Sequence, residues 1–189
     1  TEKNLANARE LFDSYLNNIF AQRSKNWVKK KLGDISEVQS GGTPLRSTSE
    51  YWGGNIAWYS SGELNETYTK ESNRYITTTG LENSNAKLFS KGSLLIGMYD
   101  TAALKMSILD RQGAFNQAIA GVKPNESIDL YFIRYVINYL KAELLNLRRG
   151  VRQNNLSLKK IKAITLPIPP LQKQTKIVSE LQDIYEETQ

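Results

Sequence analysis

The sequence predicts an α+β fold in which a sheet-rich central domain lies between two long terminal amphipathic helices. Three observations lead to this prediction. Near each end of the chain, apolar residues recur at helical spacing. Between the ends, short apolar runs alternate with clusters of Gly, Asn, Ser and Thr, a pattern typical of strands joined by turns. The 189 residues are too few for two domains of ordinary size. We place the boundaries at 1–26, 27–168 and 169–189.

The first helix is predicted over residues 4–23. Its apolar stripe consists of Leu5, Ala8, Phe12, Tyr15 and Ile19. The second begins after Pro169 and Pro170, and its stripe consists of Leu171, Val178, Leu181, Ile184, Tyr185 and Thr188. No turn joins the two helices, so each is expected to pack across the fold or on another chain. Packing of both on the central domain is the alternative.

The central domain is expected to contain five strands and two helices. The helices are predicted at 77–89 and 129–149, with Gly150 ending the second. Loops are predicted at 41–44 and 53–55, where glycines are paired. The strands are predicted at 56–59, 93–98, 105–109, 118–122 and 161–168.

Missing residue types exclude most catalytic chemistry. The chain has no Cys and no His, so it has no disulfide, no thiolate nucleophile, no Ser-His-Asp triad and no Cys/His zinc site. Neither phosphate-binding fingerprint, GxxxxGK[ST] or GxGxxG after a strand, is present. Asp100, Asp110 and Glu63 with Lys105 have no convincing spacing for a metal-dependent nuclease. We therefore expect neither an enzyme nor a bound metal.

Hydropathy points to a cytoplasmic protein. No apolar run approaches the roughly 20 residues that cross a bilayer, so no membrane span is expected. The chain opens at Thr1 with a polar stretch and shows no charged-then-apolar leader. Thr1 in place of Met also suggests that residues are missing upstream.

The positive charge is concentrated in one segment. The formal net charge is +6, and the segment 141–163 holds seven basic residues against one acidic residue. Amide side chains at Gln153, Asn154 and Asn155 lie among them. Cations with amides suit a polyanion whose edges are read by hydrogen bonds. A solvated surface, with Arg148 and Arg149 complementing a helix dipole, is the alternative.

Polar residues in the predicted loops are further candidates for nucleic-acid contacts. Thr43, Arg46 and Lys105 are expected to hold the backbone. Ser60 and Ser61 are expected to reach base edges or phosphates, and Glu63 to accept from a cytosine amino group. The glycines at 41–44 have two explanations. They expose backbone amides that bind a phosphate, or they only allow a tight turn, and the second explanation is the commoner. The nearby Trp52 and Trp58 are expected to be core anchors.

Six segments taken in order resemble the specificity subunit of type I restriction-modification systems. They are WVKKKLGDI (27–35), GGTP (41–44), YWGGNIAW (51–58), FNQAIAG (115–121), QNNLS (153–157) and LPIPPLQKQ (166–174). The resemblance covers nearly the whole chain. The chain departs from it at Lys173, where the family usually has an acid before the glutamine.

The resemblance implies a non-catalytic subunit that reads half of a bipartite site in double-stranded DNA. Residues 27–168 would be the target-recognition domain. The terminal helices would be spacers that form an antiparallel coiled coil, join two copies as a homodimer and dock a methyltransferase subunit. That partner would bind S-adenosylmethionine, so no cofactor is expected in this chain, and a restriction subunit would cleave.

Within this scheme the basic segment would contact DNA directly. Gln153 and Asn154 would approach bases, whereas Asn116 and Gln117 are assigned to internal hydrogen bonds because they precede an apolar strand. The phosphates would be held by Arg148, Arg149, Arg152, Lys159 and Lys160.

Two other functions remain open at this point. One is a protein-interaction scaffold that uses its terminal helices, and the other is a recognition domain split from a single-chain DNA methyltransferase. The chain is also compatible with a fragment of a two-domain subunit. The sequence identifies neither the target bases nor the oligomeric state.

Overall fold

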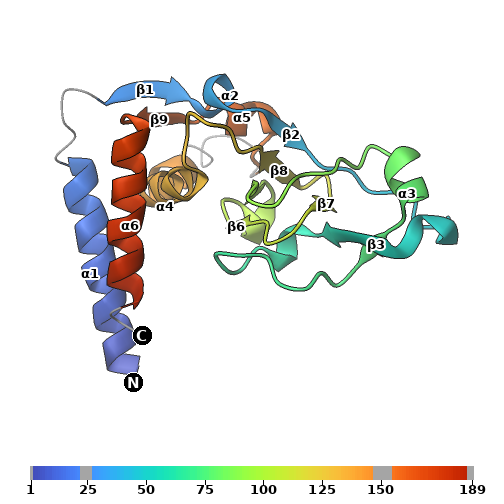
Figure 1. Cartoon of the computed structure of the whole chain (residues 1–189), viewed down its shortest axis with the longest axis horizontal. Helices are drawn as coiled ribbons and strands as arrows, with labels where there is room; N and C mark the ends of the chain where they lie inside the picture. The colour runs from blue at the N-terminus through green and yellow to red at the C-terminus, as the bar shows by residue number, and fades with distance from the viewer. Residues whose placement is uncertain (1, 22–26, 147–154, 187–189) are drawn as a thin grey trace.

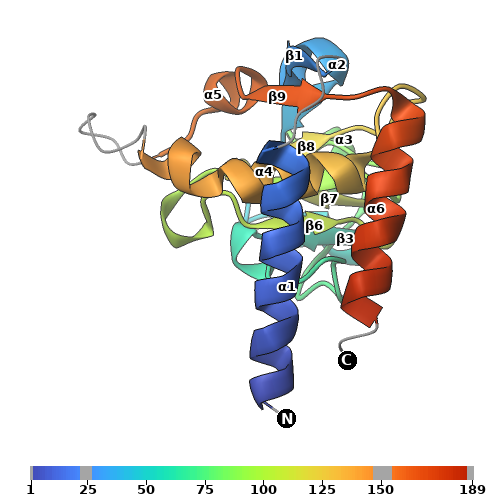
Figure 2. The same cartoon turned by 90° about the vertical axis from the view of Figure 1, so that its left-hand side faces the viewer.

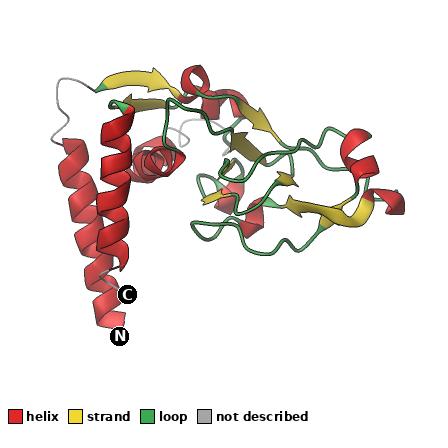
Figure 3. Cartoon of the chain, viewed as in Figure 1, coloured by secondary structure: helices red, strands yellow, loops and turns green. Residues whose placement is uncertain are grey.

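The structure of the chain, a computed structural model, describes residues 2–21, 27–146 and 155–186. The long helices gather at one end of the molecule and most of the strands at the other, while the paired strands 28–31 and 165–168 lie above the long helices (Figures 1 and 3). The helices are α1 (Glu2–Ala21), α2 (Leu32–Ile35), α3 (Thr78–Glu82), α4 (Leu130–Asn146), α5 (Leu158–Lys162) and α6 (Leu171–Glu186). The strands are β1 (Val28–Lys31), β2 (Val38–Ser40), β3 (Trp52–Tyr59), β4 (Tyr75–Ile76), β5 (Leu94–Gly97), β6 (Met106–Ile108), β7 (Gly113–Phe115), β8 (Ile119–Val122) and β9 (Thr165–Ile168).

The terminal helices lie side by side and run in opposite directions, and α4 crosses both (Figures 1 and 2). The Tyr15 hydroxyl of α1 donates a hydrogen bond of 2.5 Å to the Glu180 carboxylate of α6. Burial and this carboxylate together raise the pKa of Tyr15 to about 12. The two terminal helices therefore pack against each other within one molecule. This is the packing across the fold that the sequence predicts as one possibility.

Part of each helical stripe lies in the core of this same chain. Leu16 and Phe20 of α1 are buried, as are Ile177, Val178 and Leu181 of α6. Burying such a side chain contributes roughly 1.5–3 kcal/mol relative to leaving it in water. The apolar stripes were expected to join two copies, and their members Val178 and Leu181 are already covered within this chain. Ile19 and Tyr15 are half-buried. The side chains of Leu5, Ala8, Phe12 and Tyr185 lie outside the described set.

Two contacts connect the helical end to the central domain. The Phe20 ring stacks on Tyr139 of α4 with 4.8 Å between centroids, and its edge meets Trp27 at 5.7 Å. The buried Gln174 side chain accepts from the Asp129 amide and donates to the Pro169 carbonyl, both at 2.9 Å. Gln174 therefore satisfies the backbone where α4 and α6 begin, a point where buried polar groups need partners.

The strands form three small sheets. The first pairs β1 with β9 antiparallel, and the second is an antiparallel sheet of order β2-β8-β5-β6. The third has the order β4-β3-β7, with β3 antiparallel to β4 and parallel to β7. The second sheet packs on α4 through residues such as Leu94, Ile96 and Ile133, which are fully buried.

Several predicted elements differ in the structure. The expected loop at 53–55 is wrong, because these residues lie inside β3 at a bulge between Trp52 and Ile56. The predicted helix 77–89 ends early at Glu82, since Phe89 instead bridges Gly113. The predicted strand 161–168 begins later in the structure, because its first two residues belong to α5, whose N-cap Ser157 accepts from the Lys160 amide. The strands β1, β2, β4 and β7 were not predicted.

None of the described helices combines the length and apolar character that a membrane crossing requires.

Candidate nucleic-acid interface

Four turns meet at one side of the two larger sheets, and we call residues 41–44, 60–65, 98–105 and 116–118 the loop edge. The parallel strands β3 and β7 end together, and the Asn116 amide donates to the Tyr59 carbonyl at 2.9 Å. The end of β5 lies beside the start of β8, where the Met98 amide donates to the Ala118 carbonyl at 2.9 Å. Strand β2 ends beside the same part of β8, because Ser40 pairs with Ala120. Strand pairing therefore brings together turns that are far apart in sequence.

The glycine pair in the first turn is explained by close packing. A Cβ on Gly41 would lie 2.0 Å from the Phe115 carbonyl oxygen, and one on Gly42 would lie 2.3 Å from the Asn85 carbonyl carbon. The Gly41 amide donates to Ile119 and the Gly42 amide to Phe115, at 3.2 and 2.9 Å. Both amides are therefore used internally, which argues against phosphate binding by this segment and leaves close packing as the reason for the glycines.

Thr43 and Gln117 join two of the turns. The Thr43 hydroxyl donates to the Gln117 side-chain oxygen at 2.6 Å. The Asn116 side-chain oxygen accepts from the Ala118 amide at 3.1 Å, closing its own turn. The internal bonds expected of Asn116 and Gln117 are thus present. Thr43 shares one of them while remaining at the surface of the loop edge.

Ser60 and Glu63 form a capping box at the short 3₁₀ helix Ser61–Glu63. One Glu63 carboxylate oxygen accepts from both the amide and the hydroxyl of Ser60 at 2.8 Å. The other oxygen accepts from the Asn73 amide at 3.0 Å. Because both oxygens already have donors within the chain, Glu63 holds the turn in shape. Ser61 remains half-exposed beside it.

The turn 98–105 has an unusual backbone. Asp100 and Leu104 have φ angles of 49° and 57°, in the left-handed region that residues with a Cβ seldom adopt. Leu104 is fully buried, which holds this conformation in place. Such backbone recurs at functional sites because the surrounding structure must offset its cost of about 1–3 kcal/mol.

Lys105 ends this turn and meets a second cation. Its ammonium donates to the Asn65 side-chain oxygen at 3.1 Å, and no described ion pair includes it. Lys141 of α4 is near enough that burial first, and then the charge of Lys105, lowers its pKa. Lys141 was absent from the predicted contact residues, although its charge belongs to the basic segment.

The centre of the predicted basic segment lies outside the described residues, and this applies to Arg148, Arg149, Arg152, Gln153 and Asn154. The residues after it adjoin the loop edge. The Leu156 amide donates to the Met98 carbonyl at 2.8 Å, and the Asp100 amide donates to the Asn155 side-chain oxygen at 3.5 Å.

Lysines of α5 and β1 form a second basic region next to these residues, which we call the lysine patch. Helix α5 packs against α2, since a Cβ on Gly33 would lie 2.9 Å from the Lys162 Cβ. All lysines of the patch are exposed, and the ion pairs of the described residues include none of them. The members are Lys29, Lys30, Lys31, Lys159, Lys160 and Lys162.

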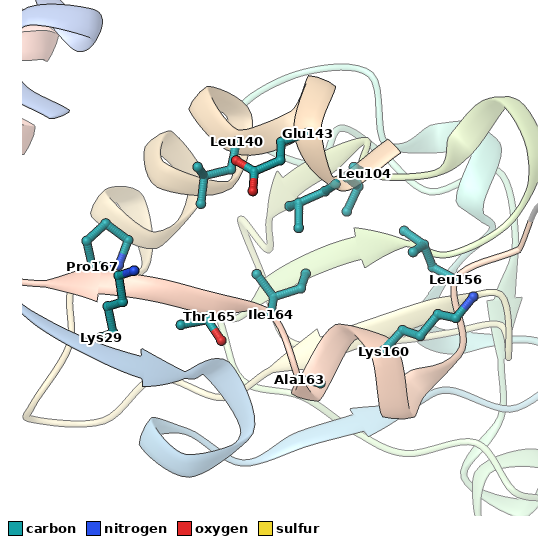
Figure 4. A pocket seen from close by; sticks show the side chains of 11 residues that line it. Lys29, Leu104, Leu140, Glu143, Leu156, Lys160, Ala163, Ile164, Thr165 and Pro167 are labelled. Atoms are coloured by element: carbon teal, nitrogen blue, oxygen red, sulfur yellow. The ribbon is translucent and has the colours of Figure 1, made fainter. Parts of the chain in front are cut away.

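An apolar hollow of about 490 Å³ opens between α4, α5 and β9. Lys29 and Lys160 lie at opposite ends of it, and Leu140, Leu156 and Ile164 lie between them (Figure 4). Glu143 is the acidic residue at its rim. Two members of the lysine patch thus border an apolar surface.

The acidic residues considered for a nuclease do not converge. Asp110 pairs with Arg111 at 2.8 Å, and Glu63 is occupied at its capping box. No group of three potential metal-ligating side chains occurs within 2–21, 27–146 and 155–186. The described cations and turns instead favour binding of an external anion.

Comparison with known proteins gives related sequences. The chain is 28% identical over 174 residues to the EcoR124I/EcoR124II specificity subunit of Escherichia coli, a type I restriction enzyme, covering 86% of this chain and 41% of that protein. It is 26% identical over 162 residues to the MjaIX specificity subunit of Methanocaldococcus jannaschii, covering 83% and 37%. The chain therefore spans less than half the length of these two relatives.

Solved structures share the fold. The HsdS subunit from Thermoanaerobacter tengcongensis superposes with a TM-score of 0.76 at 17% identity, covering 99% of this chain and 45% of that one. The S subunit of a type I system from M. genitalium gives 0.72 at 16% identity, covering 99% and 50%. The mixed helix and sheet architecture is thus one that these subunits contain. Residues 24–189 match the family described as the type I restriction modification DNA specificity domain, and the chain belongs to this family.

Proposed function

We propose that this chain is a non-catalytic DNA-recognition subunit of a type I restriction-modification complex, reading half of a bipartite site. The observation that carries the proposal is the loop edge, where four turns converge beside Lys105 and Lys141, two neighbouring cations without a described ion pair. Family membership supports the same function. Two like charges near each other repel, and an anion bound between them would relieve this repulsion.

The contact residues fall into two groups in this proposal. Ser60 and Ser61 of the loop edge approach base edges, whereas the phosphates are held by Thr43, Arg46, Lys105, Lys159 and Lys160. The residues outside the described set, Arg148, Arg149, Arg152, Gln153 and Asn154, keep the roles predicted from sequence. Glu63 acts on the bases indirectly, by shaping the turn that carries Ser60 and Ser61.

The assembly is part of the proposal. The antiparallel arrangement of α1 and α6 supports a spacer built as an antiparallel coiled coil, and exposed Leu11, with 55% of its surface accessible, leaves apolar area for a second copy. Two copies related by a twofold axis would read both halves of a site. A methyltransferase subunit that binds S-adenosylmethionine would dock on these helices, a restriction subunit would complete the complex, and the complex would act in the cytoplasm.

The experiment that tests the function is methylome sequencing of a host that carries the partner methyltransferase, with and without this chain. We expect methylation at a two-part motif only when the chain is present. An unchanged methylation pattern would contradict the proposal and favour a scaffold. Purified complex should also bind duplex DNA with an affinity that falls steeply with salt, because phosphate contacts release counterions.

A further inference from the structure

A second hollow, with arginines in its walls, lies on the antiparallel pair of strands β3 and β4, which we call the β3–β4 ribbon. It is separate from the lysine patch. It has a volume of about 500 Å³. Two arginines, two aromatic rings and a side-chain amide contribute to its walls, together with the bulged glycines of β3. These side chains are Arg46, Trp52, Asn73, Arg74 and Tyr75.

The two arginines lack acidic partners in the described part of the chain. Both are exposed, and the described ion pairs include neither Arg46 nor Arg74. Elsewhere on the same ribbon side chains are paired, since the Tyr75 hydroxyl donates to Glu71, and Glu71 pairs with Arg111. Two guanidinium groups facing one hollow present several N–H donors in planar forks, the geometry that suits phosphate oxygens.

The hollow has rigid walls. The Trp52 indole N–H donates to the Leu45 carbonyl at 3.2 Å, and its ring meets Trp58 edge-on at 5.2 Å. Trp58 is itself buried, with its N–H bonded to the Gly42 carbonyl at 2.9 Å. Trp52 therefore ties the segment that carries Arg46 to the start of β3. A ligand would meet a surface already ordered, which lowers the entropy lost on binding.

The glycine bulge leaves room above the hollow. Gly53 has φ of +79°, and no atom lies within 4 Å of the position where its Cβ would be. Gly54 packs the other way, since its Cβ would lie 2.5 Å from the Ile76 carbonyl oxygen. Glycine in a strand interior often marks a site of close backbone approach. A sugar-phosphate backbone can therefore reach Gly53 without meeting a side chain.

The hollow is connected to the loop edge by its own backbone. The Asn73 amide donates to Glu63, and the Arg74 carbonyl accepts from the Trp58 amide at 2.9 Å. The hollow therefore adjoins the loop edge at Asn73 and extends back along β3 as far as Trp52. One duplex lying along β3 would thus reach both places.

We propose that this hollow binds the sugar-phosphate backbone of duplex DNA outside the bases that the loop edge reads. Arg46 and Arg74 hold the phosphates, and the Trp52 and Tyr75 rings contact the sugars. The inference rests on the proposed DNA-recognition function. It adds a sequence-independent contact next to the loop edge.

The test compares two double variants in complex with the methyltransferase. R46A/R74A removes both arginines, and K91A/K173A removes two exposed lysines that are unpaired among the described residues. Binding to a mixed-sequence duplex of about 40 base pairs is measured from about 50 to about 200 mM salt. We expect R46A/R74A to reduce the salt slope by about 1 to 2 relative to the wild type, and K91A/K173A to leave it unchanged.

Hydroxyl-radical footprinting on the methylated motif locates the contact. R46A/R74A should lose protection on one flank only, whereas R46K/R74K should keep most of it because the charges remain. A slope and footprint equal to those of K91A/K173A would overturn this inference and leave DNA recognition intact. Absence of duplex binding by the wild-type complex would overturn both proposals. Circular dichroism of each variant shows whether the fold is retained.

Discussion

The two ends of the central sheets treat charge in opposite ways. At the end away from the loop edge, in the turn between β6 and β7, Arg111 binds Asp110 and Glu71, each at 2.8 Å. At the loop edge, Lys105 donates to the neutral Asn65 side chain, lies near Lys141 and takes part in no ion pair of the described residues. The same strands thus have one end where a cation is paired with acids and another where two cations have no described ion pair, although Glu63 and Asp100 belong to the same turns.

The pKa values reflect this difference. The hydrogen bonds that Arg111 donates to the carboxylates of Asp110 and Glu71 raise its pKa. Burial and the charge of Lys105 lower the pKa of Lys141. An acidic side chain paired with Lys105 or Lys141 would relieve their repulsion, in the way that acidic side chains neutralise Arg111 at the opposite end. Unpaired cations beside turns with left-handed backbone are therefore the feature on which the proposed anion contact at the loop edge rests.

The largest expected effect follows from charge reversal at the loop edge. Lys105→Glu removes a cation and places a carboxylate where phosphate is expected, so duplex affinity should fall roughly 10- to 100-fold. Fluorescence anisotropy of the methyltransferase complex measures this. Lys91→Glu is the matched control, because Lys91 lies in the turn before β5, beside Leu109, away from the loop edge. Equal losses for both variants would show that net charge, and not the loop edge, determines binding.

Sequence periodicity predicted the long elements well. The apolar stripes of α1, α4 and α6 are long enough to define helices, and the apolar runs of β5, β6 and β8 define strands. The short strand β1 was missed for a physical reason. All four residues of β1 are exposed and three are lysines, so tertiary pairing with β9 determines its conformation. The 53–55 loop was predicted because paired glycines also occur at bulges.

The candidate site was predicted less completely than the fold. Charge counting found the basic segment, because it needs only residue types. It could not find the proximity of Lys141 to Lys105, which depends on how α4 packs beside the 98–105 turn. Nor could it find that Glu63 is used within its turn, although Ser60 and Glu63 have the spacing of a capping box. The hollow lined by Arg46 and Arg74 depends on the β3–β4 pairing and on the hydrogen bond from Trp52 to Leu45, which join segments that are apart in sequence.

An intermediate effect is expected at this capping box. Glu63→Ala leaves the amides of Ser60 and Asn73 without acceptors, so the free energy of unfolding should fall by about 1–2 kcal/mol. Glu63→Gln keeps one acceptor oxygen and should lose less. Urea denaturation measures both. Altered DNA sequence preference in Glu63→Ala at unchanged stability would instead support direct base contact by Glu63.

The smallest effect is expected at the neutralised end. Burial raises the pKa of Asp110, but hydrogen bonds from Arg111 and Thr69 outweigh it and hold the pKa below the ordinary value of 3.8. The unfolded chain then binds the proton more readily, so acid favours unfolding. The stabilisation is present above pH 3.8 and is lost as the pH falls through the folded pKa.

Asp110→Asn should therefore reduce stability at neutral pH by at most about 1 kcal/mol, because the pair is partly exposed. Near pH 2 the variant and the wild type should differ least, since the wild-type carboxyl is then protonated. Thermal denaturation at several pH values measures this. Duplex affinity should stay unchanged, because Asp110 lies at the opposite end from the loop edge. A loss of affinity equal to that of Lys105→Glu would mean that the two ends are not separate in function.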